Sequence, residues 1–264
     1  MFYYFGYGSN MNLISLRAKG VDPIHSQKAI LRGWKLTFNV QHWFRHEGGM
    51  GNIARSSNED DLVEGVVHLC HDDQLASMDA MESFGVAYDR VEVQLETASG
   101  IVKAFAYIGM PDYLDNSCLP TRRYLNILLK GARAAELSES YIYNLSSHSL
   151  LPEIMYPVFE APAGNFPIYT SETLARHKHL TALLGAVFDM SKARPKLKVI
   201  EGLFGGKDMT LFHAKRHDTS TGTETLEEVK LGRISKPVQH YLNAYLNEYN
   251  KEFNYAGRYL YDPA

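Results

Sequence analysis

Apolar positions in the first part of the chain fall into short runs separated by glycines. Residues 3–7 form an aromatic run that reaches a glycine turn, which predicts a strand. A short helix is expected at 13–19, with Asn10 or Asn12 as its N-cap. Further strands are predicted at 24–31, 35–40, 51–55 and 64–70.

The next apolar pattern has the spacing of a helix that begins at Asp72 or Asp73. This helix is expected to reach about Glu82, with Gly85 as its end. Residues 91–96 then alternate with period two, and 103–108 form an apolar partner, so the two segments are expected to pair as a hairpin.

Helices at 124–135 and 139–145 close the first unit, and the composition then changes. Residues 146–167 are rich in proline and serine, as is typical of an irregular connection. The predicted organisation is therefore a domain at 1–150 and a C-terminal α+β region at 168–264.

The C-terminal region is predicted to hold a helix at 174–184, strands at 186–190 and 209–216, and a long final helix behind Ser235. The final helix has apolar and tyrosine side chains at helical spacing, namely Val238, Tyr241, Leu242, Tyr245, Tyr249 and Phe253. We expect this stripe to pack against its own domain or against a second subunit.

Composition is that of an ordinary globular protein, with 264 residues, 45% hydrophobic and 22% charged. The net charge of −3 offers no basic surface for nucleic acid or an anionic membrane. The two cysteines, Cys70 and Cys118, are expected to be free thiols in a reducing compartment. With no apolar run of membrane-spanning length, a cytoplasmic location is expected.

The first candidate site is the turn Tyr7-Gly8-Ser9-Asn10, where the first strand gives way to the first helix. Glycine lets the backbone approach a ligand closely, Ser9 and Asn10 add side-chain donors, and a helix start favours negative charge. These features predict an anion site. The alternative is a plain capped turn with no ligand.

The second candidate is Glu82, which follows Leu75 and Met78 at helical spacing and so shares their core-facing stripe. A carboxylate on such a stripe is desolvated, and desolvation raises the pKa of a carboxyl group toward neutral pH. Glu82 is therefore a candidate general acid–base. The alternative is a frayed helix end at which Glu82 faces water.

Taken together, these motifs resemble the γ-glutamylcyclotransferase family over residues 3 to about 147. The matching segments are residues 5–11, 31–39, Trp43 with 48–53, 64–67, 75–82, 120–124, and 131–132 ahead of Leu137. The opening is closer to the γ-glutamyl-amino-acid branch than to the glutathione-specific branch. One departure is Ser83, where the family commonly has glycine directly after its catalytic glutamate.

The resemblance implies a small mixed β-barrel with flanking helices that carries out an intramolecular aminolysis. The α-amino group of a γ-glutamyl unit attacks its own side-chain amide, which releases an amine and forms 5-oxoproline. Such a cyclising transfer would class the enzyme as a lyase or an acyltransferase. The resemblance also implies a role in glutathione metabolism. It implies Glu82 as base and then acid, and needs no cofactor or metal.

The family also suggests which residues bind the substrate. They are Tyr7, Gly8, Ser9, Asn10, Gly49, Met50, Tyr88 and Tyr107. Tyr88 and Tyr107 each have an ordinary alternative as strand aromatics in the core. His42 and His46 are two possible metal ligands without an evident third, so a metal is discounted.

Three hypotheses follow for the whole chain. The first is a γ-glutamylcyclotransferase acting on a small γ-glutamyl molecule. The second is removal of a γ-glutamyl protecting group in a biosynthetic pathway, and the third is a non-catalytic binding or regulatory module. The C-terminal region is expected to cap the site, to form a homodimer or to bind a partner, and the first of these is favoured.

Overall fold

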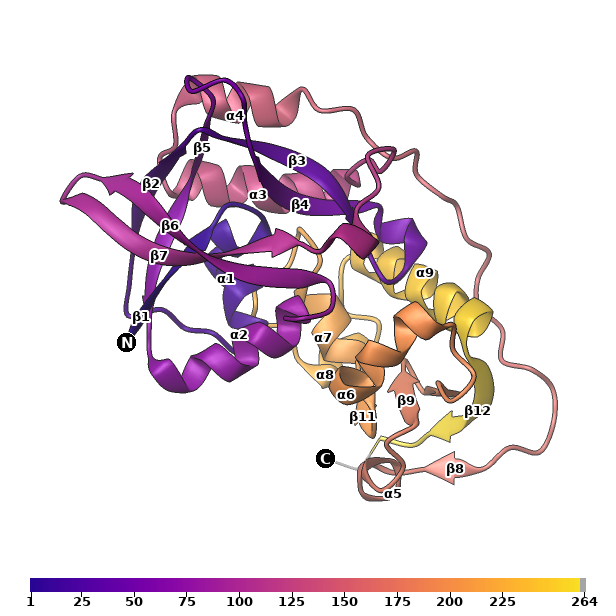
Figure 1. Cartoon of the computed structure of the whole chain (residues 1–264). Helices are drawn as coiled ribbons and strands as arrows, with labels where there is room; N and C mark the ends of the chain where they lie inside the picture. The colour runs from indigo at the N-terminus through magenta and orange to yellow at the C-terminus, as the bar shows by residue number, and fades with distance from the viewer. Residues whose placement is uncertain (262–264) are drawn as a thin grey trace. The chain divides into compact units, whose positions relative to one another are not determined.

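A computed structural model describes residues 1–261 of the chain. It divides into two units, Met1–Glu153 and Ile154–Ala264 (Figure 1). The last three residues of the predicted C-terminal region, 262–264, lie outside the described part.

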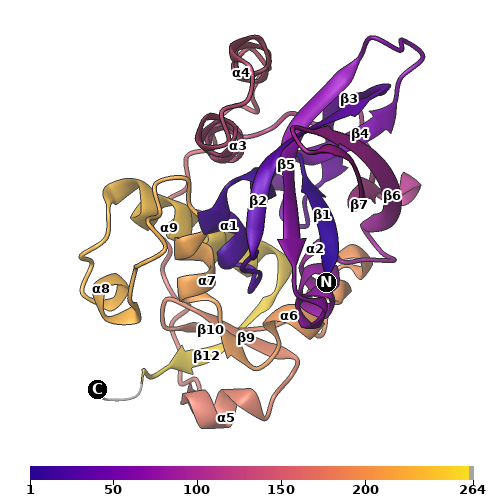
Figure 2. The same ribbon diagram turned by 90° about the vertical axis from the view of Figure 1, so that its left-hand side faces the viewer.

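Five strands of the first unit close into a barrel (Figure 2). In barrel order they are β1 (Phe2–Gly6), β5 (Leu62–Cys70), β2 (His25–Arg32), β6 (Tyr88–Thr97) and β7 (Gly100–Gly109). The barrel is mixed, because β1 runs antiparallel to β5 and parallel to β7. Two further strands, β3 (Trp34–Gln41) and β4 (Gly49–Arg55), form a separate ribbon. The predicted fold class is confirmed.

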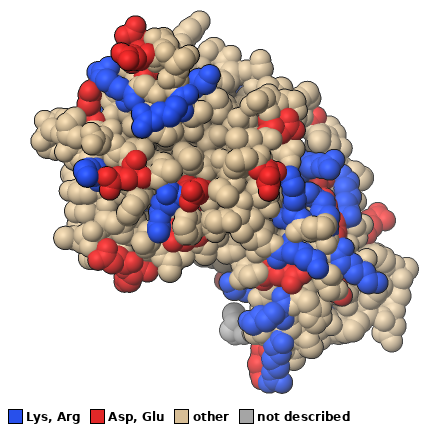
Figure 3. Space-filling view, in the orientation of Figure 1, with Lys and Arg blue, Asp and Glu red and all other residues tan. Residues whose placement is uncertain are grey.

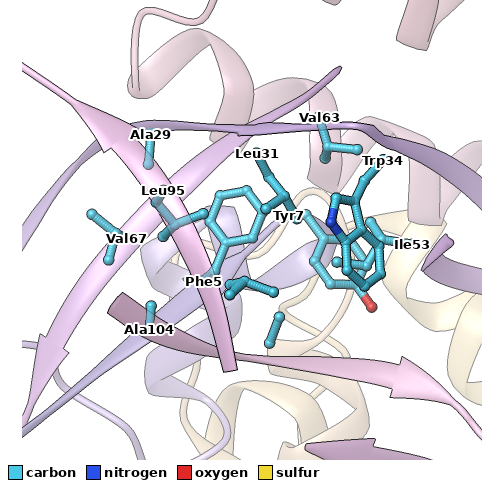
Figure 4. Close-up of a cluster of buried hydrophobic side chains, with 12 residues drawn as sticks. Phe5, Tyr7, Ala29, Leu31, Trp34, Ile53, Val63, Val67, Leu95 and Ala104 are labelled. Atoms are coloured by element: carbon cyan, nitrogen blue, oxygen red, sulfur yellow. The ribbon is translucent and has the colours of Figure 1, made fainter. Parts of the chain in front are cut away.

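The barrel interior is filled by one or more apolar side chains from every strand (Figure 4). Examples at most 4% exposed are Phe5, Leu31, Val67, Leu95 and Ala104. The predicted hairpin supplies two of them, since β6 alternates between buried and solvent-facing positions as it pairs with β7. Burying each large side chain contributes about 1.5–3 kcal/mol.

One helix of the first unit has 13 residues, and the others have eight or fewer. They are α1 (Leu13–Arg17), α2 (Leu75–Glu82), α3 (Arg122–Ala134) and α4 (Glu139–Ser146), with 3-10 turns η1 (Ser9–Met11), η2 (Arg45–Glu47), η3 (Asp72–Gln74) and η4 (Pro111–Tyr113). Asn12 caps α1 by accepting from the N–H groups of Ile14 and Ser15. The predicted last residue of α2, Glu82, is confirmed, but the residue that ends the helix is Ser83, in a left-handed conformation, and not Gly85.

The second unit is built on a five-stranded sheet of order β11-β9-β10-β12-β8. Its strands are β8 (Ile168–Tyr169), β9 (Leu180–Leu183), β10 (Ala186–Asp189), β11 (Lys207–Asp208) and β12 (Asn254–Tyr259). Its helices are α5 (Ser171–Ala175), α6 (Glu201–Phe204), α7 (Thr210–Lys215), α8 (Leu226–Lys230), α9 (Lys236–Glu252) and the 3-10 turn η5 (Pro195–Ile200). The predicted strand at 186–190 and the long final helix are confirmed.

Two elements predicted for this unit are wrong. The helix expected at 174–184 is the short α5 followed by strand β9, because a Thr170 capping box starts the helix early and Leu180–Leu183 is buried at every position. The strand expected at 209–216 is helix α7, whose buried Thr210, His213 and Ala214 have helical rather than alternating spacing.

The tyrosine stripe of α9 packs within its own unit. Tyr245 and Tyr249 are at most 1% exposed. Tyr249 contacts the ring of Phe188 edge-on, and its hydroxyl lies 2.8 Å from the His213 ring. For these two tyrosines, the expectation that the stripe packs against its own domain is therefore confirmed, rather than the alternative of a second subunit.

Among residues 1–261, every helix is too short or too polar to span a bilayer. On the face shown in Figure 3, acidic and basic side chains are interspersed, in line with 27 basic and 30 acidic residues in the sequence.

Candidate active site

Glu82 is the last residue of α2, and its side chain is only 13% exposed. Met78, one turn earlier, is completely buried, and Leu75 packs partly buried in the same cluster. The periodicity that marked Glu82 as core-facing is therefore confirmed, and the alternative of a frayed, solvent-facing end is excluded.

Asn10 brings the first turn of the chain to this carboxylate. Its side-chain Nδ2 donates to Oε1 of Glu82 at 2.9 Å and lies 2.6 Å from the hydroxyl of Tyr4. Asn10 is only 4% exposed, so this contact is made in the interior. The two candidate features, 72 positions apart in the sequence, thus meet in one place.

Lys19 completes this contact and was missed from the sequence. Its Nζ donates to Oδ1 of Asn10 at 2.7 Å and to Oε1 of Glu82 at 3.0 Å. A lysine just before Gly20, at the end of a short helix, is typical of a solvated last turn. The Lys19 side chain is nevertheless only 7% exposed, because of packing in the folded unit that the local sequence does not show.

The turn itself is organised around the hydroxyl of Tyr124, which comes from α3. This hydroxyl accepts a hydrogen bond from the N–H of Gly51 at 3.0 Å. A Cβ atom on Gly8 would lie 3.0 Å from the same oxygen, and one on Gly51 would lie 3.1 Å from it. A side chain at either position would crowd the Tyr124 hydroxyl, so both positions favour glycine.

Five buried tyrosines surround Glu82. Burial raises the pKa of each hydroxyl, and the negative charge of Glu82 raises it further. They are Tyr4, Tyr7, Tyr88, Tyr107 and Tyr124. At neutral pH these side chains are therefore neutral groups that can donate or accept hydrogen bonds around a carboxylate.

The hydroxyls of three predicted substrate-binding tyrosines have partners within the protein. Tyr7 donates to the carbonyl of Tyr107, and Tyr88 donates to the carbonyl of Gly51 at 3.0 Å. Tyr107 donates to Oδ1 of Asp79 at 2.6 Å, and Arg90 holds the other oxygen of that carboxylate at 3.0 Å. These hydrogen bonds show that the three tyrosines help to hold the structure around the site. A direct role in substrate binding remains a prediction.

The structure treats Gly49 and Met50 differently. A Cβ atom on Gly49 would lie 1.9 Å from the carbonyl oxygen of Phe38, so this glycine is needed for the packing of β3 against β4. Its N–H donates to the carbonyl of Leu119 at 2.9 Å. Met50, in contrast, packs against two clusters that contain Tyr88, Tyr107 and Tyr124, and so belongs to the surroundings of the site.

His68 supports the turn from behind. Its ring contacts the carbonyl oxygen of Asn10 through Nε2 at 2.9 Å and the hydroxyl of Ser26 through Nδ1 at 2.8 Å. Burial lowers the pKa of His68 to about 4, so the ring is neutral at pH 7. Because a carbonyl only accepts, Nε2 carries the proton and Nδ1 accepts from Ser26.

A cavity of about 410 Å³ lies elsewhere in the first unit, where β3, β5 and α4 meet. Its lining includes Lys35, Glu64, Tyr141 and His148, but neither Asn10 nor Lys19. Burial would raise the pKa of Glu64, but hydrogen bonds from Ser138 and the ion pair with Lys28 lower it overall. Within residues 1–261, no group of three or more His, Cys, Asp or Glu is arranged to hold a metal ion.

Comparison with known proteins bears on the first unit. A family model described as "Gamma-glutamyl cyclotransferase, AIG2-like" matches residues 4–126. The protein "Gamma-glutamyl cyclotransferase gliK" of Claviceps purpurea (strain 20.1) is 27% identical over 159 residues, which cover 57% of this chain and 68% of that protein.

Solved structures cover the same part. The crystal structure of the uncharacterized protein loc79017 from Homo sapiens is 26% identical, covers 58% of this chain and 90% of its own, and has a TM-score of 0.51. A structure named "Gamma-glutamyl cyclotransferase" is 24% identical, over 57% of this chain and 89% of its own, with a TM-score of 0.49. The similarity to the family described as "Gamma-glutamyl cyclotransferase, AIG2-like" thus lies in residues 4–126, within the first unit.

Proposed function

We propose that the first unit is a γ-glutamylcyclotransferase that cyclises a γ-glutamyl amide. The α-amino nitrogen of the substrate forms a bond to its own γ-carbonyl carbon, and the bond from that carbon to the leaving nitrogen breaks. The products are 5-oxoproline and a free amine or amino acid. Between its ammonium form and the lactam, the attacking nitrogen loses two protons, and both end on the leaving nitrogen, so the reaction needs no co-reactant.

The observation that carries this proposal is the 2.9 Å contact between the Glu82 carboxylate and the Asn10 amide. This contact places a proton acceptor, the Glu82 carboxylate, beside the first turn of the chain. That turn has the glycine and the polar donors that could bind an anionic group of the substrate. Both elements lie in a domain of the family whose name describes this reaction.

In this mechanism Glu82 takes the proton from the α-ammonium group and returns it to the departing nitrogen. Positioned proton transfer of this kind contributes roughly 10²–10⁴ in rate. The turn at Gly8 and Ser9 would bind the glutamyl α-carboxylate. Holding the tethered amine over the carbonyl is worth an effective molarity of about 10⁵–10⁸ M.

The test is incubation with a panel of γ-glutamyl amino acids, glutathione and γ-glutamyl amides of bulkier amines, followed by mass spectrometry of 5-oxoproline. Glu82→Gln keeps the shape of the side chain and should lower kcat by roughly 10²–10⁴ while KM changes little. Glu92→Gln is the control, because Glu92 lies on the surface of β6 in an ion pair with Lys103.

Two results would refute the proposal. One is 5-oxoproline formation by Glu82→Gln at the wild-type rate. The other is a wild type that forms none from any member of the panel; ligand binding by that inactive protein would then favour a binding module. The panel also separates small leaving amino acids from the bulky amines expected of a protecting group.

A further inference from the structure

We propose that Lys19 is a positioning residue of this site, which fixes the orientation of the Asn10 amide and supplies the positive charge that keeps Glu82 ionised. This inference rests on the proposed function, in which Glu82 must begin the reaction as a carboxylate. Lys19 is not expected to touch the substrate; it acts through Asn10 and Glu82.

The orientation of Asn10 follows from the chemistry of its neighbours. A lysine ammonium group only donates hydrogen bonds, so the Asn10 atom 2.7 Å from Nζ must be the amide oxygen. An ionised carboxylate only accepts, so the atom 2.9 Å from Glu82 must be the amide nitrogen. The flipped amide would place oxygen against oxygen and NH₂ against ammonium, and both contacts would be repulsive.

Burial strengthens these contacts, because water cannot readily replace a partner that is lost. The side chains of Lys19 and Glu82 are 7% and 13% exposed, so little water is available to replace a lost partner. Nζ touches both other groups, at 2.7 Å from Asn10 and 3.0 Å from Glu82. Removing the ammonium therefore takes away one restraint on the amide and one positive charge at the carboxylate together.

Six titratable groups around Glu82 and Asn10 stay neutral near pH 7. From β1, β6, β7 and α3 come tyrosine hydroxyls whose pKa burial raises, namely Tyr4, Tyr88, Tyr107 and Tyr124, with Tyr7 just after β1. From β5 comes His68, whose pKa is about 4. On α2 itself, Asp79 is ion-paired with Arg90 at 3.0 Å.

The proton path leaves Lys19 unchanged. The α-ammonium of the substrate gives one proton to Glu82, the free amine attacks the γ-carbonyl, and Glu82 passes that proton to the leaving nitrogen as its bond to carbon breaks. The attacking nitrogen loses a second proton to Glu82 as the lactam forms, and Glu82 gives this proton to the released amine, which leaves as an ammonium ion. Lys19 keeps its own protons throughout. Its contribution is to make the carboxylate, rather than the neutral carboxylic acid, the form present when the substrate binds.

The matched variants are Lys19→Met, which has nearly the same length and no charge, and Lys19→Arg, which keeps the charge. The control is Lys28→Met, because Lys28 forms an ion pair of the same 3.0 Å length with another buried glutamate, Glu64. The measurement is the pH profile of kcat/KM for 5-oxoproline formation, with circular dichroism to check folding.

We expect the acid limb of the Lys19→Met profile to move up by roughly one pH unit or more, because a positive neighbour is lost. We also expect at least a tenfold lower kcat above that limb, because Asn10 is no longer held. Lys19→Arg should keep the wild-type limb, and Lys28→Met should match the wild type. An unmoved limb in a folded Lys19→Met enzyme would overturn the inference.

A second measurement does not depend on turnover. The Glu82 side-chain carboxyl carbon, labelled with ¹³C and assigned with Glu82→Gln, is titrated by NMR in the wild type and in Lys19→Met. A higher midpoint in the variant supports the charge effect even if no γ-glutamyl compound is a substrate, which would defeat only the proposed function. Equal midpoints would defeat the role of Lys19.

Folding failure is covered by two further variants. Lys19→Gln keeps hydrogen-bonding groups without the charge, and it should show the same shift of the limb and the midpoint. If neither neutral variant folds, Lys19→Arg decides the matter, since it must keep at least about a tenth of the wild-type turnover. Its complete loss of activity with an intact fold would show that a positive charge is not what the site requires.

Discussion

Acid should weaken the first unit through His68, because this ring is completely buried and burial disfavours its charged form. Its Nε2 donates to the carbonyl of Asn10 and its Nδ1 accepts from Ser26, so a second proton would reverse the bond to Ser26 and place a positive charge in the interior. Burial lowers the pKa of His68 from 6.5 to about 4, and the backbone bond to Asn10 offsets only part of that effect.

The sign follows from proton binding. In the unfolded chain His68 takes a proton as the pH falls below about 6.5, whereas in the folded unit it does so only near pH 4. The stability that His68 contributes is therefore fully present above pH 6.5 and is lost as the pH falls toward 4. At about 1.4 kcal/mol per pH unit, the loss between pH 6.5 and 4.5 is about 2.5 kcal/mol.

The assay is urea unfolding followed by tryptophan fluorescence at several pH values between 7 and 4.5. Both tryptophans of the chain, Trp34 and Trp43, lie in the first unit, so the signal reports on that unit. In His68→Gln the free energy of unfolding should fall by about 2.5 kcal/mol less over this range than in the wild type. His25→Gln, which changes an exposed histidine of β2, should keep the wild-type slope.

Equal slopes for wild type and His68→Gln would refute this reasoning. So would an NMR titration of the His68 ring with a midpoint near 6.5, the value of an exposed histidine.

Two further predictions concern Ser83 and Asp208. Ser83→Gly should stabilise the first unit by about 1 kcal/mol, because Ser83 has a left-handed backbone (φ 50°, ψ 52°) and a buried hydroxyl without a hydrogen-bond partner among residues 1–261. A lower thermal midpoint would contradict this. Burial raises the pKa of Asp208 from 3.8 to about 6, so the second unit should gain about 2–3 kcal/mol as the pH falls from 6 to 4, and lose it as the pH rises again. Hydrogen exchange of α7 amides should show this gain in the wild type and not in Asp208→Asn; equal behaviour of the two would disprove it.

Local signals were sufficient for much of the first unit. Glycines, caps and period-two alternation mark β1, β2, β6 and β7 in the sequence, because each strand has one face in the barrel core. The position of Glu82 on the apolar stripe of α2 was likewise visible, since helical spacing alone places it beside Met78. In this unit the pattern and the three-dimensional structure agree.

Other features depend on contacts that no local pattern records. Lys19 has the sequence context of an exposed lysine, and only the closure of the barrel brings it to Glu82. In the second unit, β9 is buried at all four positions and so has no alternation to detect. The short strand β12 comes just after α9 and contains a glycine, so its sequence is only a weak signal for a strand. Its strand conformation becomes evident only from its pairing with β10 and β8.

The chemistry proposed for Glu82 depends on how differently its neighbours hold protons. Burial raises the pKa of the surrounding tyrosine hydroxyls above the physiological range, so they cannot take up or release charge near neutral pH. His68 is held neutral by the opposite effect, since burial lowers its pKa to about 4. A proton released by a bound amine would therefore pass to the carboxylate at the centre, and Tyr88→Phe should leave the acid limb of the pH profile in place even where it weakens binding. A limb that moved with Tyr88 would mean that the proton is shared with the hydroxyls, and that Glu82 does not act as the base alone.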